Sequence, residues 1–282
     1  ALESGYVDCC IVAGFDDDLP WRARPKLATT REELIAGAQS KHVVVTNNEL
    51  LGLAIERGYQ KIGVVGLPCQ VHGLRKIGYH ARPKAIAERI KLVISPFCGT
   101  NFLFEGTRHQ LFEWCDIEDL SDVQKLEYRG HSWPGHFVVQ SKTKGETVID
   151  RHTSAYHGLA PCWGRDRCMM CIDYSGELAD LSVGSYWAPG LEPGVEKGRT
   201  AVLIRTDIGQ EIIESADRAG ALQMETIPHS DLLQIMGFES KKHGHVTRLM
   251  WRQRFGWPVP NYHYRSVATP IKKGLWTCPE DK

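Results

Sequence analysis

Four cysteines are candidates for a shared metal centre. Cys168 and Cys171 form a Cys-Met-Met-Cys motif, and two cysteines three positions apart can place both sulfur atoms on one centre. The motif alone fits half of a zinc site, half of an iron–sulfur site or a redox dithiol. A thioredoxin-like dithiol is disfavoured, because the pair does not open a helix directly after a predicted strand.

Cys69 and Cys98 each follow a predicted β-strand at its carboxyl end. The strands cover residues 61–65 and 91–97, and ligands of open α/β sheets collect outside the carboxyl ends of the strands. The two thiols can therefore face one crevice, where the Cys168–Cys171 pair would complete four thiolates. Four thiolates fit a cubane iron–sulfur cluster or a tetrahedral zinc ion. On spacing alone, simple filling of the core remains the other interpretation of Cys69 and Cys98.

The elements that must position these cysteines alternate between strand and helix over the first hundred residues. A capping box of Thr30 and Glu33 starts one helix, and Asn47 is predicted to cap the next. This rhythm favours an α/β layer with a mainly parallel sheet and flanking helices. Strands are predicted at 6–13, 43–46, 61–65 and 91–97, helices at 30–38, 47–57, 70–77 and 85–90, and a polar connection at 14–25.

The middle and the end of the chain have different patterns. Antiparallel strands are predicted at 123–129, 136–142 and 146–151, and a cysteine-rich loop follows at 160–174. Two more strands (181–185 and 200–205), an amphipathic helix (207–219) and a basic, mostly helical tail (231–254) complete the predicted elements. We expect an α/β fold, α+β overall, in three parts at 1–120, 121–224 and 225–282. The opening ALESG resembles the last turn of a helix ending at Gly5, so the chain is predicted to begin inside an element.

The composition narrows the classes of function. The 282 residues carry 34 basic and 34 acidic side chains, and this zero net charge argues against nucleic acid as the main partner. No apolar run approaches the roughly 20 residues of a membrane-spanning helix. Nine cysteines at uneven spacing do not resemble a disulfide scaffold. No secretory signal is visible, so we expect a cytoplasmic protein, in which this many thiols indicates a metal or a cluster.

Four motifs in order resemble a known family, the beta subunits of coenzyme F420-reducing hydrogenases and dehydrogenases, which also includes the 7-hydroxymethyl chlorophyll a reductases. The resemblance covers most of residues 1–224. Members usually begin with a glycine-containing helix ahead of the residues that match ALESGYVD, and that helix is absent here. The motifs are GLPCQVHGLRK (66–76), FCGTNF (97–102), CMMCIDY (168–174) and ELADLSVGS (177–185).

The resemblance implies two resident cofactors and a soluble hydride carrier. Family members are similar in using FAD beside a four-cysteine [4Fe–4S] cluster, with coenzyme F420 as the substrate. On this match the cluster ligands are Cys69, Cys98, Cys168 and Cys171, and Cys162 is the residue that could replace one of them. The flavin and cluster would occupy the part at 1–120, with the Cys168–Cys171 loop supplied by the part at 121–224.

The flavin site has no dinucleotide fingerprint to mark it. GxGxxG is missing from the sequence, but backbone amides at glycine turns and helix starts can hold phosphates without it. Three segments are candidates, although each is more commonly an ordinary turn, and Lys41 more commonly a solvated lysine. They contribute the cofactor-binding candidates Gly37, Ser40 and Lys41, then Gly66, Pro68 and Gln70, then Ser182, Gly184 and Ser185.

Three functions remain open. The first is an electron-transfer flavoprotein that passes electrons between coenzyme F420 and a hydrogenase, dehydrogenase or ferredoxin-type subunit, with no catalytic side chain of its own. The second is a ferredoxin-dependent reductase of an organic substrate such as a tetrapyrrole. The third is a zinc-stapled interaction subunit without redox activity.

A partner subunit is expected near the cysteine-rich loop, because one flavin and one cluster convert a hydride into electrons but do not consume them. Trp163, Arg165, Asp166 and Arg167 would line that contact. The basic residues of the tail are a second, weaker candidate for docking, whereas His229, His243 and His245 are predicted on a solvated face. The basic residues are Lys241, Lys242, Arg248, Arg252 and Arg254.

Overall fold

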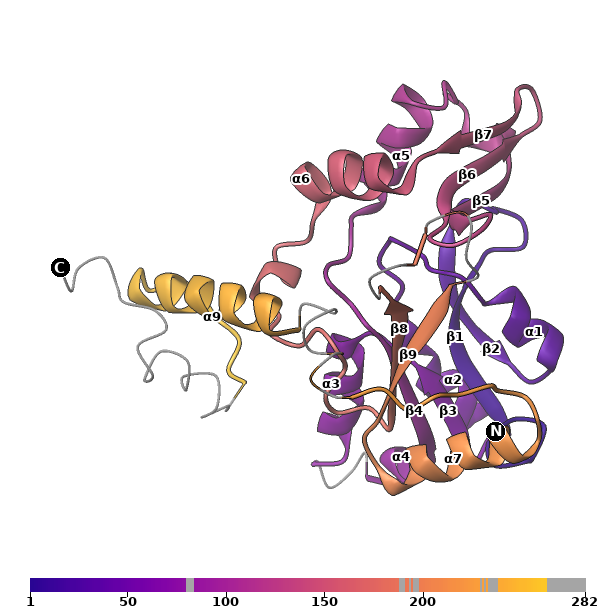
Figure 1. Ribbon diagram of the computed structural model, residues 1–282, viewed down its shortest axis with the longest axis vertical. Helices are drawn as coiled ribbons and strands as arrows, with labels where there is room; N and C mark the ends of the chain where they lie inside the picture. The colour runs from indigo at the N-terminus through magenta and orange to yellow at the C-terminus, as the bar shows by residue number, and fades with distance from the viewer. Residues whose placement is uncertain are drawn as a thin grey trace.

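Two β-sheets organise the chain in the computed structural model (Figure 1). The structure describes residues 1–79, 84–187, 191–192, 194, 198–228, 230, 232 and 238–262. The larger sheet has six strands in the order β2-β1-β3-β4-β8-β9. Its central strands run parallel and are β1 (Cys9–Phe15), β3 (Ile62–Val65), β4 (Ile90–Pro96) and β8 (Leu181–Tyr186). The edge strands β2 (Ala23–Ala28) and β9 (Arg199–Ile204) are antiparallel to their neighbours.

Short helices cover the parallel strands. The buried core joins Ile11, Val64 and Val93 of the strands to Ala54 and Val71 of the helices, as expected for strands buried on both faces. The predicted capping box is present, since Glu33 N donates to Thr30 Oγ1 (3.2 Å) and Thr30 N donates to Glu33 Oε2 (3.1 Å). The helices are α1 (Arg31–Ala36), the 3₁₀ turn η1 (Asn47–Glu49), α2 (Leu50–Glu56), α3 (Pro68–Ile77), α4 (Lys84–Ala87) and α7 (Asp207–Arg218).

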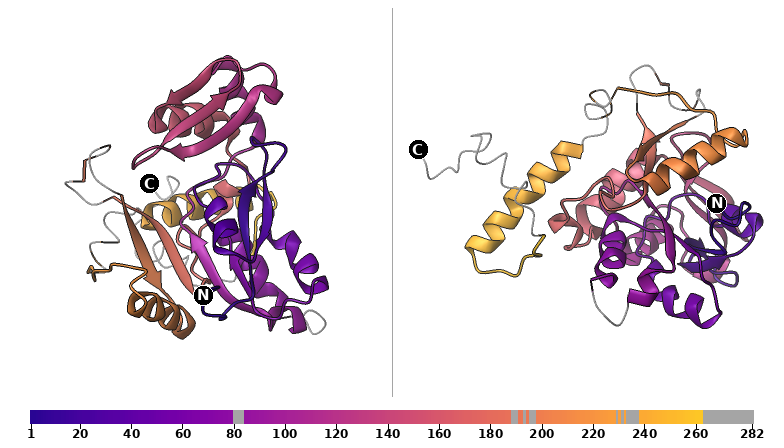
Figure 2. Two further views of the ribbon diagram at one scale, coloured as in Figure 1. Left: turned by 90° about the vertical axis from the view of Figure 1, so that its right-hand side faces the viewer. Right: turned by 90° about the horizontal axis from the view of Figure 1, so that it is seen from below.

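A second, antiparallel sheet lies beyond the carboxyl ends of the parallel strands (Figures 1 and 2). It consists of β5 (Val123–Gly130), β6 (His136–Ser141) and β7 (Gly145–Ile149), preceded by α5 (Phe104–Glu113) and the 3₁₀ turn η2 (Leu120–Asp122). Its core of Leu111, Leu126 and Phe137 includes Phe15 from the end of β1 as a partly buried neighbour. Packing of that ring onto the second core joins the two sheets.

The cysteine-rich segment and the tail form the remaining elements. The π-helix η3 (His152–Leu159) runs into α6 (Ala160–Trp163), and the 3₁₀ turn η4 (Cys168–Met170) carries the CxxC motif. The helix α9 (Phe238–Arg254) projects from the body of the molecule (Figures 1 and 2). Among the described residues, no helix is both long and apolar enough to cross a membrane.

The predicted fold class is confirmed, namely a mainly parallel sheet with flanking helices, antiparallel strands in the middle and a helical tail. The strands β8 and β9 extend the sheet of the first hundred residues, so this sheet draws on both 1–120 and 121–224. The three-part division stays a prediction. Residues 231 and 233–237 of the predicted tail, and His229, which was predicted on a solvated face, lie outside the described residues.

Three local predictions were wrong. The connection predicted at 14–25 gives way at Ala23 to β2, an edge strand that accommodates Pro25 because an edge leaves one side of the backbone unpaired. In place of a strand at 43–46 there is a single bridge from Val43 to Phe102. Asn47 does not cap a helix, since its side-chain amide donates instead to the carbonyl of Val65 at the end of β3 (2.7 Å).

Candidate functional site

The four candidate cysteines come from three segments that meet beside the larger sheet. Cys69 lies in the first turn of α3, directly after β3, and Cys98 follows the end of β4. Cys168 begins the turn η4, and Cys171 directly follows its last residue. A backbone hydrogen bond from Cys98 N to the carbonyl of Tyr174 (2.8 Å) ties the β4 loop to the CxxC loop.

The thiols point to neighbouring backbone groups. Sγ of Cys98 lies 3.7 Å from the carbonyl oxygen of Thr100, and Sγ of Cys168 lies 3.8 Å from that of Asn101. Sγ of Cys171 turns back to the carbonyl oxygen of Asp173 at 3.4 Å. Cys98 and Cys168 thus approach the same short loop from two sides, although 70 positions separate them in the sequence.

Burial opposes ionisation of three of these thiols and so raises the pKa of Cys69, Cys98 and Cys171. Desolvation raises the pKa of Cys98 to about 12; the positive charge of Lys241 acts against this shift, and the charges of Cys168, Cys69 and Cys171 add to it. Desolvation followed by the charges of Cys171 and Cys168 raises the pKa of Cys69. The thiols of Cys69, Cys98, Cys168 and Cys171 therefore lie within electrostatic reach of one another. Metal binding needs thiolates, so a bound cationic centre would supply the stabilisation that the protein alone does not.

No group of three or more His, Cys, Asp or Glu side chains in the described segments is placed so that it could hold a single metal ion. A [4Fe–4S] cubane makes a different geometric demand, because its four thiolates bind separate iron atoms and surround a body larger than one ion. The looser gathering of four thiols is compatible with that demand.

A buried carboxylate connects α3 to the CxxC loop. Oδ2 of Asp173 lies 2.9 Å from Nε2 of His72, one helical turn after Cys69, and the backbone amides of Gly176 and Glu177 donate to the same carboxylate (2.7 and 3.0 Å). Burial of Asp173 would raise its pKa, but the bond and charge of His72 and the two amides outweigh that effect and lower the pKa. Asp173 is thus held as a carboxylate that fixes the loop.

The helix α9 lies against the same loop from the other side. Lys241 Nζ donates to the carbonyls of Cys98 (2.7 Å) and Asp173 (3.1 Å), and Nδ1 of His245 lies 2.6 Å from the carbonyl oxygen of Cys171. Lys242 pairs with Glu177 at 2.5 Å, and the hydroxyl of Tyr262 donates to the carbonyl of Met170 (3.0 Å). The prediction of a solvated His245 was wrong, because this half-buried side chain contacts the loop. Nothing in the periodicity of the tail indicated these contacts.

The turn after β3 places two flavin candidates beside Cys69. Gln70 bridges two segments, since its Oε1 accepts from Leu67 N (2.8 Å) and its Nε2 donates to the carbonyl of Val45 (2.6 Å). Gly66 and Pro68 are buried in this turn. Close by, Asn48 donates to the carbonyl of Gln70 (2.9 Å), while Oδ1 of Asn47 and Oδ1 of Asn48 are buried acceptors that lack a donor among the described residues.

The side chain of Lys41 binds carbonyl groups at the C-terminal end of α1. Lys41 Nζ donates to the carbonyls of Gly37 (2.7 Å) and Ala38 (2.5 Å), and desolvation lowers the pKa of its ammonium to about 8. Gly37 allows α1 to lie close to β1, because a Cβ added there would stand 2.9 Å from Cγ2 of Val12. Ser40, half-buried, follows in the same loop.

The candidates in β8 are split between two environments. Ser182 is fully buried, donates to the carbonyl of Gly176 (3.1 Å) and accepts from Arg205 Nε (2.8 Å). Gly184 makes room for the ring of Phe97, since a Cβ there would stand 2.2 Å from Cδ2. Ser185 accepts from Arg129 of β5 (2.9 Å). Only Ser185 therefore contacts the second sheet.

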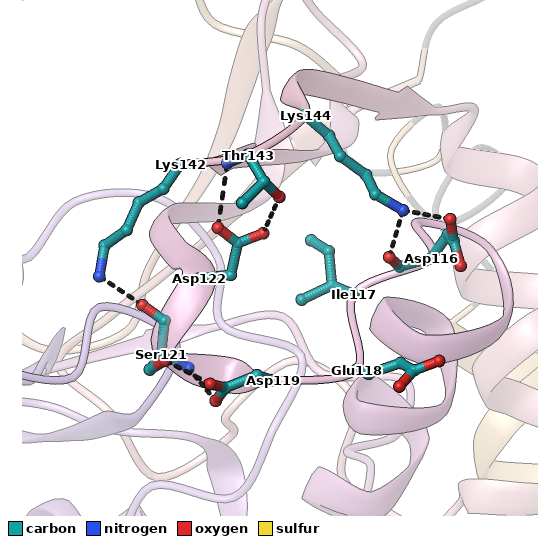
Figure 3. A pocket seen from close by; sticks show the side chains of 9 residues that line it. All are labelled: Asp116, Ile117, Glu118, Asp119, Ser121, Asp122, Lys142, Thr143 and Lys144. Atoms are coloured by element: carbon teal, nitrogen blue, oxygen red, sulfur yellow. Dashed lines mark hydrogen bonds and ion pairs between the residues drawn. The ribbon is translucent and has the colours of Figure 1, made fainter.

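A surface hollow at the far side of the second sheet involves none of these residues (Figure 3). Its polar side chains bind one another, as Thr143 Oγ1 donates to Asp122 (2.7 Å) and Lys142 donates to the carbonyl of Ser121 (2.6 Å). Lys144 likewise pairs with Asp116. These internal bonds leave the hollow little capacity to bind a ligand.

Comparison with known proteins places this geometry in a family. Two models of the family described as "Coenzyme F420 hydrogenase/dehydrogenase, beta subunit" match the chain, the N-terminal model at residues 1–52 and the C-terminal model at residues 59–230. The coenzyme F420 hydrogenase beta subunit of Methanococcus voltae is 33% identical over 268 residues, which cover 92% of this chain and 87% of that protein.

Two more distant relatives extend the comparison. The coenzyme F420-dependent sulfite reductase of Methanocaldococcus jannaschii is 27% identical over 305 residues, covering 99% of this chain and 44% of that protein. A chain in the F420-reducing [NiFe] hydrogenase complex of Methanosarcina barkeri has the same fold, with a TM-score of 0.70 at 24% identity over 94% of this chain and 87% of that chain.

Proposed function

The chain belongs to the beta-subunit family of coenzyme F420 hydrogenases and dehydrogenases, and from that premise we propose that it passes electrons between coenzyme F420 and a redox partner subunit through FAD and a [4Fe–4S] cluster. The observation that carries the proposal is the meeting of four thiols from three segments at one place. Family membership makes the protein an oxidoreductase subunit; the cofactors and the direction of electron flow are the proposal.

The proposed cluster ligands are Cys69, Cys98, Cys168 and Cys171. The neighbouring ammonium of Lys241, and the contacts of Lys241 and His245 with the carbonyls of Cys98 and Cys171, suit a negatively charged iron–sulfur centre. Such a cluster, when bound, exchanges single electrons. The chain's own contribution is to hold the CxxC loop through Asp173 and His72 and to shield it with α9.

The proposed flavin site begins at the Gly66–Gln70 turn, adjacent to Cys69, and extends towards Ser185. The turn leads into the N-terminus of α3, and backbone amides at a helix N-terminus can hold a phosphate of the nucleotide. Arg129, which donates to Ser185, would place positive charge between the two sheets for a phosphate. FAD, when bound, accepts a hydride and releases electrons one at a time. Gly37, Ser40 and Lys41 at α1, with Ser182 and Gly184 in β8, are proposed as its outer boundary.

Cofactor analysis of the full chain tests this assignment. Anaerobically purified or reconstituted protein should contain about four iron atoms, about four sulfides and one FAD per chain, with broad absorption near 400 nm. A colourless protein that contains zinc in place of iron would support the alternative function, a zinc-stapled interaction subunit without redox activity. A protein that contains iron but no flavin could not accept a hydride and would act only as a carrier of single electrons.

A further inference from the structure

Large apolar side chains gather at the C-terminal end of α9 and in the residues directly after it. Met250, Trp251, Phe255 and Trp257 are 47%, 38%, 61% and 56% exposed. Single exposed hydrophobic residues are ordinary, but contiguous aromatic ones indicate an interaction site. The projecting position of α9 in Figures 1 and 2 leaves this end accessible.

These residues and two arginines form one connected surface, here named the aromatic–arginine patch (Trp251, Arg252, Arg254, Phe255 and Trp257). The rings of Trp251 and Phe255 stack at 6.0 Å, and those of Phe255 and Trp257 lie 5.7 Å apart. Arg254 lies over Trp251 at 5.8 Å and Arg252 over Trp257 at 5.4 Å. Trp and Arg dominate the binding energy of interfaces, and side chains already held against one another lose less entropy on binding.

The patch is continuous with the candidate cluster site. His245 contacts Cys171, and Trp251 follows it six positions later, which is about 9 Å along the helix axis. After the helix the chain returns, since Tyr262 donates to the carbonyl of Met170 within the CxxC motif. A protein bound to the patch would therefore contact the same helix whose earlier residues Lys241 and His245 hold the CxxC loop.

The charge of this segment identifies the kind of partner. Residues 241–262 contain five Lys or Arg and no Asp or Glu, although the whole chain has zero net charge. Cationic surfaces attract acidic partners and steer their approach. We infer that the aromatic–arginine patch docks an iron–sulfur protein whose acidic surface surrounds an apolar centre, and this inference rests on the proposed function. One electron passes between the two iron–sulfur centres in each transfer, so the centre that gives it is oxidised and the other reduced, without any atom being moved.

The test uses the full chain with its cluster reconstituted and an acidic ferredoxin with two [4Fe–4S] clusters as the probe. Phe255→Ala combined with Trp257→Ala should raise the dissociation constant at least tenfold and slow electron transfer to the ferredoxin. Arg252→Glu combined with Arg254→Glu should have a similar effect and should flatten the dependence of binding on salt. Arg254, Phe255 and Trp257 are exposed and Arg252 is half-buried at the end of the projecting helix, so the iron content and the thermal unfolding midpoint should stay close to the values of the unchanged chain.

Matched controls lie elsewhere on the surface. Phe112→Ala on α5 removes a ring that is 50% exposed, and Arg57→Glu after α2 reverses an exposed charge; both should leave binding within twofold. Equal effects of patch and control variants would overturn the proposal. So would a concentration-dependent dimer abolished by the patch variants, which assigns the patch to a second copy, or binding that appears only after removal of residues 263–282, which assigns it to the chain's own tail. Failure of the proposed function is distinguishable, because it shows as missing iron or flavin in the unchanged chain.

Discussion

At the scale of single residues, Cys98 and Cys162 differ in every property that matters for ligation. Cys98 is half-buried and lies near three other thiols and Lys241, whereas Cys162 is exposed near the end of α6. Cys98→Ser should reduce the iron content from about four atoms per chain to below one, with loss of the EPR signal of the reduced cluster. Cys162→Ser should retain both. The reverse pattern would make Cys162 the fourth ligand.

Lys241 and Lys242 form a matched pair for testing charge near the cluster. Lys241 binds the carbonyl of Cys98, while Lys242 is paired with Glu177. Removing the nearer charge by Lys241→Gln should destabilise the reduced cluster by about 1 kcal/mol, or roughly 40 mV more negative for one electron. An EPR-monitored redox titration measures this potential, and Lys241→Arg should restore most of it. A shift of the same size in Lys242→Gln would show a general effect of charge instead.

At the scale of elements, the CxxC loop depends on Asp173. Its carboxylate binds His72 and two backbone amides, so Asp173→Asn in the metal-free chain should lower the free energy of unfolding by about 2 kcal/mol. Urea unfolding followed by circular dichroism measures the change. Asp166→Asn, at an exposed position of the same loop, should change it by less than about 0.5 kcal/mol. Equal losses in the two variants would mean that the buried carboxylate does not fix the loop.

The ring of His42 lies against Tyr128 of β5 and Phe102, and its burial makes the stability of the fold sensitive to pH. Burial, with the charges of Arg129 and Arg151, lowers its pKa from 6.5 to about 3, so between these values the unfolded chain binds a proton that the folded chain does not. Stability should therefore fall as the pH drops below about 6.5, with a contribution of about 1.4 kcal/mol per pH unit. Unfolding of His42→Gln at pH 7 and pH 5 should lack this contribution, whereas exposed His109→Gln should retain it. The same pH dependence in both variants would assign it to other groups.

At the scale of the whole molecule, the sequence allowed prediction of what local patterns encode. Strand and helix periodicity located β3, β4, β8 and α7, and the Thr30–Glu33 pair located the start of α1. Contacts over long sequence separations had no local signal. The approach of Lys241 to Cys98 spans 143 positions, and the bond between His72 and Asp173 spans 101. Edge strand β2 was missed because its charges and Pro25 resemble a loop when its single pairing partner is unknown.

The arrangement of the two sheets would allow the larger sheet to hold both proposed cofactors. Parallel strands β3 and β4 direct Cys69 and Cys98 to one edge, and the second sheet faces the carboxyl ends of the parallel strands. The proposed flavin therefore lies next to a cluster ligand, a separation on the order of 10 Å or less that single-electron transfer requires. The CxxC loop and α9 would close the other side of the proposed cluster.

Reduction of the reconstituted full chain by reduced coenzyme F420 tests the central claim most directly. Under anaerobic conditions, stopped-flow absorption should show bleaching of the flavin near 450 nm, and samples frozen afterwards should show the EPR signal of a reduced [4Fe–4S] cluster. NADH at the same concentration should produce neither change. In the Cys98→Ser variant the flavin should still bleach while the cluster signal is missing. Equal reduction by NADH, or no reduction by reduced coenzyme F420 in a chain that holds both iron and flavin, would contradict the account.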